Sequence, residues 1–263
     1  MSKIKVNDVN LYYERLGRGQ ALVFIHGLGS STKDWGSQLE EFSKNYQVIT
    51  FDLRGHGQSD KPAGPYSIPL FATDTTALLN ALGIDSAHMV GISLGGAVAF
   101  QLAIDFPALV KTLTIVNSAP TLGGTPEQAK AEIDRRVGIV KQMGMRAMGE
   151  ALAPNLFPKP EHEVLRRGFI ESWAENDPQA YIESTLSMLG WDVTNQIHSI
   201  LCPTLILASD QDYSPVAVKE AYIKLMPNVQ LIVLPDAHHA VPMEAPEKFN
   251  EALKEFLAKH SSR

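Results

Sequence analysis

Apolar segments alternate with amphipathic ones along most of the chain. Six runs rich in valine, isoleucine and leucine have the composition and length of buried strands: Ala21–Ile25, Gln47–Phe51, Ala87–Gly91, Val110–Val116, Thr204–Ala208 and Val229–Leu234. Apolar positions recur at helical spacing in the stretches between and after them, at about Lys33–Phe42, Ile68–Leu82, Leu94–Phe106, Val216–Met226 and Pro246–Lys259. A hairpin of Lys3–Val6 and Asn10–Arg15 is expected before the first run. This order predicts an α/β fold whose mostly parallel sheet is flanked by helices on both faces.

The alternation fails between about Pro120 and Gln196. This stretch has helical patterns, several prolines and no clear strand; its expected helices are Glu127–Met143, Pro160–Glu175 and Pro178–Leu189. Because predicted strands lie on both sides of it, we expect a helical excursion above the strand ends, where ligands bind in open α/β sheets. The chain is therefore interpreted as a single domain of residues 1–263 with a helical lid inserted at about 120–196.

Composition limits the classes of function. Of the 263 residues, 44% are hydrophobic and 20% charged, which is typical of a globular protein with a substantial core. The net charge of −6 argues against nucleic-acid binding, which normally leaves a basic footprint. No segment is long and apolar enough for a membrane span or a signal-peptide core, and the single Cys202 excludes an intramolecular disulfide. We expect a cytoplasmic enzyme that binds neither membrane nor nucleic acid; self-association into a homo-oligomer stays open.

One motif carries the chemistry. Gly91-Ile92-Ser93-Leu94-Gly95 ends an apolar strand pattern and begins a helical one. In that context G-x-S-x-G is a nucleophile elbow, in which a strained serine projects from a sharp strand-to-helix turn. Glycine stands two positions on either side, where a side chain would collide with neighbouring backbone. Ser93 is therefore the candidate nucleophile, and it needs a base, an acid and an oxyanion hole.

The acid and the base should follow the serine in chain order. The histidines that come far downstream, after the last strand, are His238 and His239. The preceding strand is followed by Asp210 and Asp212, either of which could orient the imidazole. These observations alone do not decide between the two histidines as the base or between the two aspartates as the acid.

The oxyanion hole requires backbone N–H groups aimed at the developing negative charge. One is expected from Leu94, directly after the nucleophile at a helix N-terminus. The other is expected from the loop His26-Gly27-Leu28-Gly29, with Leu28 as the donor. We interpret His26 as a residue that fixes this loop rather than as a second base.

With these motifs assembled, the chain resembles lid-bearing α/β-hydrolase fold enzymes of the esterase, haloperoxidase and enol-lactone hydrolase group. The resemblance rests on His26-Gly27-x-Gly29, on Asp52-Leu53-Arg54-Gly55-His56-Gly57-Gln58-Ser59, on the elbow and on the two late loops. It implies His239 as the base, given its distance from Glu244-x-Pro246. It implies Asp212 as the acid, three positions after the small Ser209. It also implies that Asp52–Ser59 is architectural.

The resemblance implies a cofactor-free and metal-free serine hydrolase that cleaves small carboxylic esters. Relatives that dehalogenate alkyl halides or open epoxides carry aspartate at the position of Ser93. An enol-lactone hydrolase or a C–C bond hydrolase of aromatic catabolism would share this site, and a ligand-binding receptor on the same fold is the rival from another class.

The predicted lid supplies the candidates for the substrate pocket. Trp173, Trp191 and Met145 lie within it as possible wall residues. Cationic side chains that faced Ser93 would favour the lactone and C–C bond substrates, which carry carboxylates. The sequence offers five there without choosing among them: Arg135, Arg136, Arg146, Arg166 and Arg167.

Overall fold

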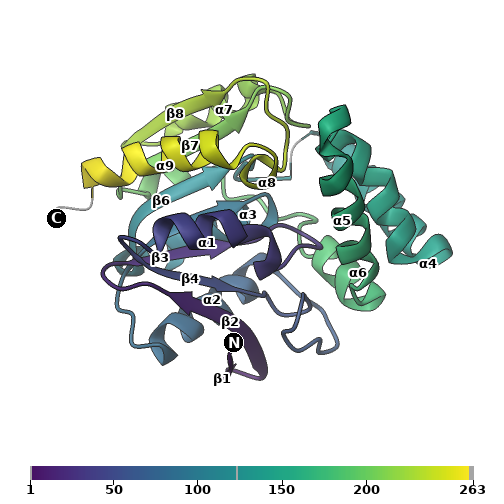
Figure 1. Ribbon diagram of the computed structural model, residues 1–263, viewed down its shortest axis with the longest axis horizontal. Helices are drawn as coiled ribbons and strands as arrows, with labels where there is room; N and C mark the ends of the chain where they lie inside the picture. The colour runs from purple at the N-terminus through teal and green to yellow at the C-terminus, as the bar shows by residue number, and fades with distance from the viewer. Residues whose placement is uncertain (1, 123, 261–263) are drawn as a thin grey trace.

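The computed structural model describes residues 2–122 and 124–260, and its centre is one twisted sheet (Figure 1). The strands are β1 Ser2–Val6, β2 Val9–Leu16, β3 Ala21–Ile25, β4 Gln47–Phe51, β5 Ala87–Ile92, β6 Val110–Val116, β7 Thr204–Ser209 and β8 Val229–Leu234. Their order across the sheet is β1-β2-β4-β3-β5-β6-β7-β8. The β1–β2 and β2–β4 pairs are antiparallel and the rest are parallel. The predicted α/β fold and its strands are confirmed, with strand ends shifted by at most a residue or two.

Helices cover both faces of this sheet. They are α1 Gly36–Phe42, α2 Ile68–Ala81, α3 Leu94–Asp105, α4 Pro126–Leu156, α5 Glu163–Ala174, α6 Pro178–Leu186, α7 Val216–Tyr222, α8 Val241–Glu244 and α9 Pro246–His260. Short 3-10 turns precede α1 at Thr32–Trp35 and α5 at Pro160–His162, follow α3 at Pro107–Leu109 and α7 at Ile223–Leu225, and lie at Ile197–Ser199. The helix predicted from Lys33 is therefore a 3-10 turn followed by α1, and the four-residue α8 had no counterpart in the prediction.

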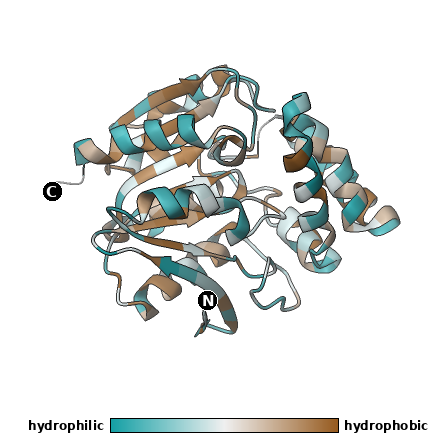
Figure 2. Cartoon of the chain, in the orientation of Figure 1, coloured by the Kyte–Doolittle hydropathy of each residue, from teal (hydrophilic) through white to brown (hydrophobic). Residues whose placement is uncertain are grey.

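The sheet separates two apolar cores. Along β3, Val23 and Ile25 belong to the core beneath α2 and α3, whereas Leu22 and Phe24 belong to the core beneath α1 and α9. This alternation follows from the period-2 geometry of a strand that is buried on both faces. Figure 2 shows the result as hydrophobic strands between helices whose outer surfaces are polar.

The predicted insertion forms α4, α5 and α6, which stand together beside the sheet (Figure 1). Thr125 begins α4 with a capping box, since its hydroxyl accepts from the Gln128 N–H and the Gln128 side chain accepts from the Thr125 N–H. Pro120 and Thr121 meet Val193 and Asp192 where the chain leaves and rejoins the sheet: the Val193 N–H donates to the Pro120 carbonyl at 2.9 Å, and Thr121 pairs with Asp192 in an isolated bridge. The excursion thus has a closed base.

Gly144 divides α4 into two helical segments. Its φ of 82° and ψ of 179° are not helical, and glycine adopts them without the steric cost of a side chain. The sequence prediction ended at Met143 and missed the second segment, which continues to Leu156. Within the described residues, no helix combines the length and apolar character that crossing a membrane requires.

Candidate active site

Ser93 occupies the turn between β5 and α3 with a strained backbone. Its φ is 54° and its ψ is −118°, a region that a non-glycine residue rarely adopts. The strain is held from three sides: the Ser93 N–H donates to Val116 at 3.1 Å, and the Ser93 carbonyl accepts from the Ala97 N–H at 3.1 Å and from the Ser118 hydroxyl at 2.8 Å. This is the geometry of a nucleophile elbow.

The two flanking glycines are there for space. A Cβ on Gly91 would overlap the Gly95 carbonyl, and a Cβ on Gly95 would overlap the Ile25 carbonyl of β3. Helix α3 therefore begins close to two strands, which places the Ser93 side chain at the carboxyl edge of the sheet.

His239 and Asp212 form a hydrogen-bonded pair in the loops after β8 and β7. The distance from His239 Nδ1 to Asp212 Oδ1 is 2.6 Å, and the Asp212 side chain is 1% exposed. Burial alone would raise the pKa of Asp212, but the hydrogen bond from His239 and the charge of Lys219 outweigh it and lower the pKa to about 2. Since a carboxylate only accepts hydrogen bonds, Nδ1 of His239 carries a proton and Nε2 is the ring nitrogen that Asp212 leaves unengaged.

The two alternatives are engaged elsewhere. His238 Nδ1 lies 2.6 Å from Glu244 Oε1, and its backbone N–H donates to Glu244 Oε2 at 2.8 Å. Asp210 is exposed and accepts from the Ala237 N–H at 3.2 Å. Of the candidates from the sequence, the structure thus brings His239 and Asp212 together.

Asn117, at the end of β6, ties the two late loops to the sheet. Its amide N–H₂ donates to the Ser209 hydroxyl at 2.9 Å and to the carbonyl of His239 at 3.0 Å, while its Oδ1 accepts from the Ser209 N–H at 2.8 Å. The sequence analysis did not identify this bridging role of the Asn117 amide, which depends on contacts between segments far apart in the chain.

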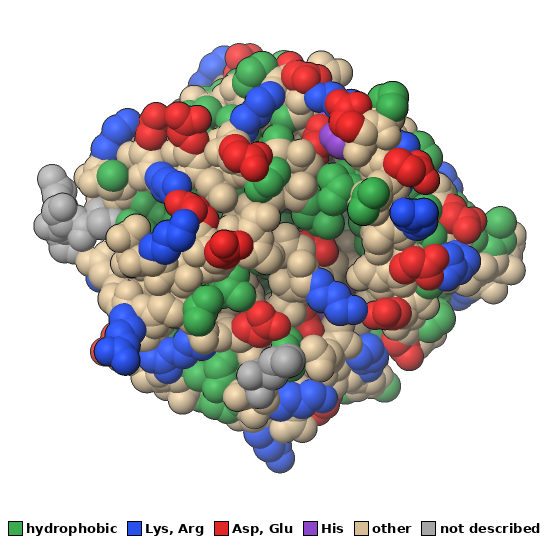
Figure 3. Space-filling model, viewed as in Figure 1, with side chains coloured by type: hydrophobic (Ala, Val, Ile, Leu, Met, Phe, Trp, Pro, Cys, Tyr) green, Lys and Arg blue, Asp and Glu red, His purple; other side chains and the backbone are tan. Residues whose placement is uncertain are grey.

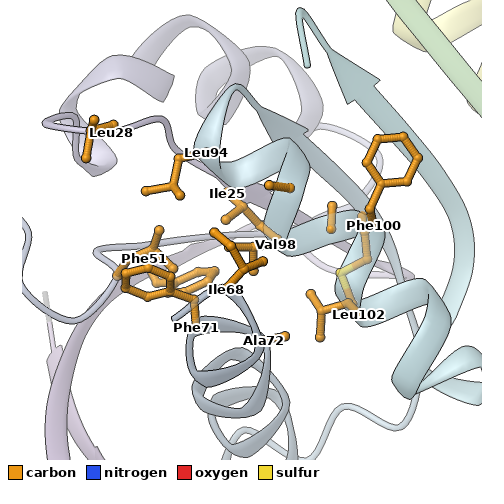
Figure 4. Close-up of a cluster of buried hydrophobic side chains, with 14 of the residues drawn as sticks. Ile25, Leu28, Phe51, Ile68, Phe71, Ala72, Leu94, Val98, Phe100 and Leu102 are labelled. Carbon is orange, nitrogen blue, oxygen red and sulfur yellow. The ribbon is translucent and has the colours of Figure 1, made fainter. Parts of the chain in front are cut away.

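The loop after β3 is fixed as expected. His26 is fully buried, with Nδ1 2.7 Å from the Gly27 carbonyl and Nε2 accepting from the Leu53 N–H at 3.0 Å. Burial lowers the pKa of His26 to about 4, so the ring is neutral and its role is structural. Figure 4 shows Leu28 of this loop and Leu94, the first residue of α3, at the same end of one hydrophobic cluster.

A cavity of about 680 Å³, counted with its open mouth, contains Ser93 and His239 in its wall, together with Gly27 and Leu28. The insertion supplies Arg136, Leu152, Leu156, Phe169 and Trp173, and α8 with its approach supplies Ala240, Pro242 and Met243. Figure 3 shows hydrophobic side chains gathered where the surface is hollowed beside the insertion. The wall is thus apolar, with a few polar groups, as is usual for small-molecule sites.

Of the three residues expected in the pocket wall, Trp173, Trp191 and Met145, the structure places one in the wall of this cavity. Trp173 lines the cavity, where it packs on Phe169 with 4.9 Å between ring centroids. The Trp191 indole instead donates to Gln101 of α3 at 2.9 Å, and Met145 is buried in the apolar core. In the described part of the chain neither lines this cavity, so the two are packing residues.

One of the five arginines reaches the cavity wall. Arg136 lines it with an 18% exposed side chain, and its Nε donates to Glu132 at 2.7 Å. Arg135 shares the same Glu132 but is 47% exposed, and Arg146 pairs with Glu171 on the surface. Because Arg135 and Arg136 share Glu132, this carboxylate balances the charge of Arg136 only in part.

Two further wall residues had no place in the prediction. Tyr213 stacks on His239, with ring centroids 4.1 Å apart and planes at 24°. Asp34 accepts a hydrogen bond from the Ser30 hydroxyl, and burial together with the charge of Asp52 raises its pKa to about 7. Asp34 lies in the 3-10 turn Thr32–Trp35, a few residues after the loop that contains Leu28, and this nearness in sequence was the available signal.

Among the described residues, no group of three or more His, Cys, Asp and Glu side chains is arranged to hold a metal ion.

Comparison with known proteins agrees with the fold. The model of the alpha/beta hydrolase fold family matches residues 20–246. The 3-oxoadipate enol-lactonase 2 of Acinetobacter baylyi is 31% identical over 255 residues, covering 95% of this chain and 94% of that protein. A putative carbamate hydrolase of Azorhizobium caulinodans is 28% identical, covering 95% of each chain. The structure of a thermophilic esterase from Thermogutta terrifontis, solved with malate bound, superposes with a TM-score of 0.91 at 28% identity, covering 99% of this chain and 100% of that one.

Proposed function

This chain belongs to the α/β-hydrolase fold family, and on that premise we propose that it is a serine hydrolase that cleaves small carboxylic esters through an acyl-enzyme on Ser93. The observation that carries the proposal is that His239, hydrogen-bonded to Asp212 at 2.6 Å, lines the same cavity as the strained Ser93. Acyl transfer requires a nucleophile together with an imidazole base whose orientation is fixed.

In the proposed mechanism, the Ser93 hydroxyl attacks the ester carbonyl while His239 Nε2 takes its proton. Asp212 holds the ring and stabilises the imidazolium that forms. The backbone N–H groups of Leu28 and Leu94 stabilise the oxyanion, helped by the N-terminus of α3. His239 then protonates the departing alcohol, and water hydrolyses the acyl-enzyme by the same route. The insertion acts as the lid of this site, and Trp173 shapes the acyl pocket.

Ser93→Ala is the direct test. We expect a loss of kcat on the order of a million-fold with an unchanged fold, because binding energy cannot replace the nucleophile. A serine-directed phosphonate should add to the parent protein at Ser93 and leave the variant unlabelled. Esterase turnover near that of the parent in the variant would contradict the proposal. Only slow, single-turnover cleavage by the parent would favour a ligand-binding receptor instead.

A carboxylate-bearing ester or lactone is a second candidate substrate, and Arg136 favours it. This guanidinium lines the same cavity as Ser93 and carries charge that Glu132 only partly balances. Arginine is well suited to a carboxylate because it offers paired N–H donors. The relative named for 3-oxoadipate and the esterase solved with malate point to the same class of compound. A panel of p-nitrophenyl esters, enol-lactones and carboxylated dienones would separate ester, lactone and C–C bond hydrolysis by their kcat/KM values.

A further inference from the structure

Lys219 is a fully buried lysine behind the proposed acid. It lies on α7, and its side chain is 0% exposed. Its Nζ is 2.6 Å from Asp212 Oδ2 and 2.6 Å from the Ser214 carbonyl, and it also contacts the Ser214 hydroxyl. Lysine is almost never fully buried unless it is paired, so the hydrogen bonds to Asp212 and Ser214 are what offset the cost of burying this charge.

The two oxygens of Asp212 therefore have different partners. Oδ1 accepts from His239 and Oδ2 accepts from Lys219, each at 2.6 Å. An uncompensated carboxylate would strongly favour the protonated imidazole. A fixed positive charge on its other oxygen cancels part of that field, so the imidazole gives up its proton more readily.

Other charges near His239 do not supply this effect on Asp212. Tyr213 covers one face of the ring, and Arg136 and Asp34 lie in the cavity wall. Glu244 is next to the loop, where it is engaged with His238. Unlike these groups, Lys219 contacts the Asp212 carboxylate directly.

We propose that Lys219 is a positioning residue of the reaction, a fixed buried cation that offsets part of the negative field of Asp212 and thereby sets the pH at which His239 acts as the base. The inference rests on the proposed function of Ser93, Asp212 and His239. Its consequence is a hydrolase whose activity extends to lower pH than that of the same triad without the lysine.

The test is the pH profile of kcat/KM for a p-nitrophenyl ester in Lys219→Met and Lys219→Gln. Methionine keeps most of the side-chain volume, and glutamine keeps a hydrogen-bond donor; neither carries charge. We expect the acid limb of the profile to move up by about one pH unit in both, which is a tenfold loss of kcat/KM below the limb. Lys219→Arg should bring the limb back toward that of the parent.

Ser214→Ala is the matched control, since it removes a neutral hydrogen-bond partner of Asp212 and Lys219 without changing any charge. Its acid limb should stay within about 0.3 pH unit of the parent's. A lower melting temperature with an unmoved limb in the neutral Lys219 variants would overturn the proposal, as would failure of both to fold, because the lysine would then be structural. A failure of the proposed function itself would be recognised separately, because the Ser93→Ala variant would then keep its esterase activity.

Discussion

Replacing Arg136 with methionine would remove a cation from the cavity wall while keeping much of the length and apolar surface of the side chain. If Arg136 binds a substrate carboxylate, the loss should fall on charged substrates alone. Hydrogen bonds to charged groups contribute about 1.5–3 kcal/mol. The side chain is 18% exposed and Glu132 already occupies its Nε, so the lower end of that range applies. The expected loss is roughly 10- to 30-fold in kcat/KM for a carboxylated ester.

The assay compares two p-nitrophenyl esters of equal acyl length, the neutral butyrate and the hemisuccinate. Arg136→Met should lower kcat/KM for the hemisuccinate and change that for the butyrate less than about threefold. Arg135→Met is the control, because Arg135 binds the same Glu132 from outside the cavity wall, with 47% of its side chain exposed. Equal losses on both esters, or the same selectivity change in the control, would refute the reasoning.

Three further predictions follow from the same geometry. His239→Ala should cost kcat about as much as Ser93→Ala, since the two act as a unit; His238→Ala should instead lower the melting temperature by releasing Glu244, and reversed effects would place the base at His238. Asp212→Asn should reduce kcat by about ten-thousand-fold by favouring the wrong imidazole tautomer, whereas Asp210→Asn should keep most activity; comparable losses in steady-state kinetics would withdraw this assignment. Because the pKa of Asp34 is raised to about 7, this carboxyl gains its negative charge as the pH rises through 7 and should then repel an anionic substrate. The KM for the hemisuccinate should therefore rise between pH 6 and 8 in the parent and stay level in Asp34→Asn, and a rise that persists in the variant would exclude Asp34.

The strands could be predicted because a parallel strand buried on both faces is an unbroken apolar run. The elbow could be predicted because the tight approach of β5, α3 and β3 leaves no space for a side chain at Gly91 or Gly95. Both features leave a pattern that is local in sequence, although the space at Gly95 is restricted by Ile25 of the distant β3.

Contacts between distant segments were harder to predict. Periodicity identifies the apolar face of a helix but not the segment that this face contacts. The sequence therefore could not distinguish Trp173, which lines the cavity, from Trp191, which is hydrogen-bonded to Gln101. Lys219 was missed because a lysine in an amphipathic helix is usually solvated, and its burial depends on Asp212 being close by. Gly144 concealed the second half of α4 because a positive φ interrupts the periodic pattern.

The closed base of the insertion bears on how such a protein can diversify. The bridge between Thr121 and Asp192 and the bond from Val193 to Pro120 bring the two ends of the excursion together at the edge of the sheet. Ser93 precedes these ends in the chain, and Asp212 and His239 follow them. We therefore expect that a foreign helical segment with equally close ends could be grafted between them without moving Ser93, Asp212 or His239. On the proposed function, a change of this segment would alter substrate selectivity and leave the proposed triad in place.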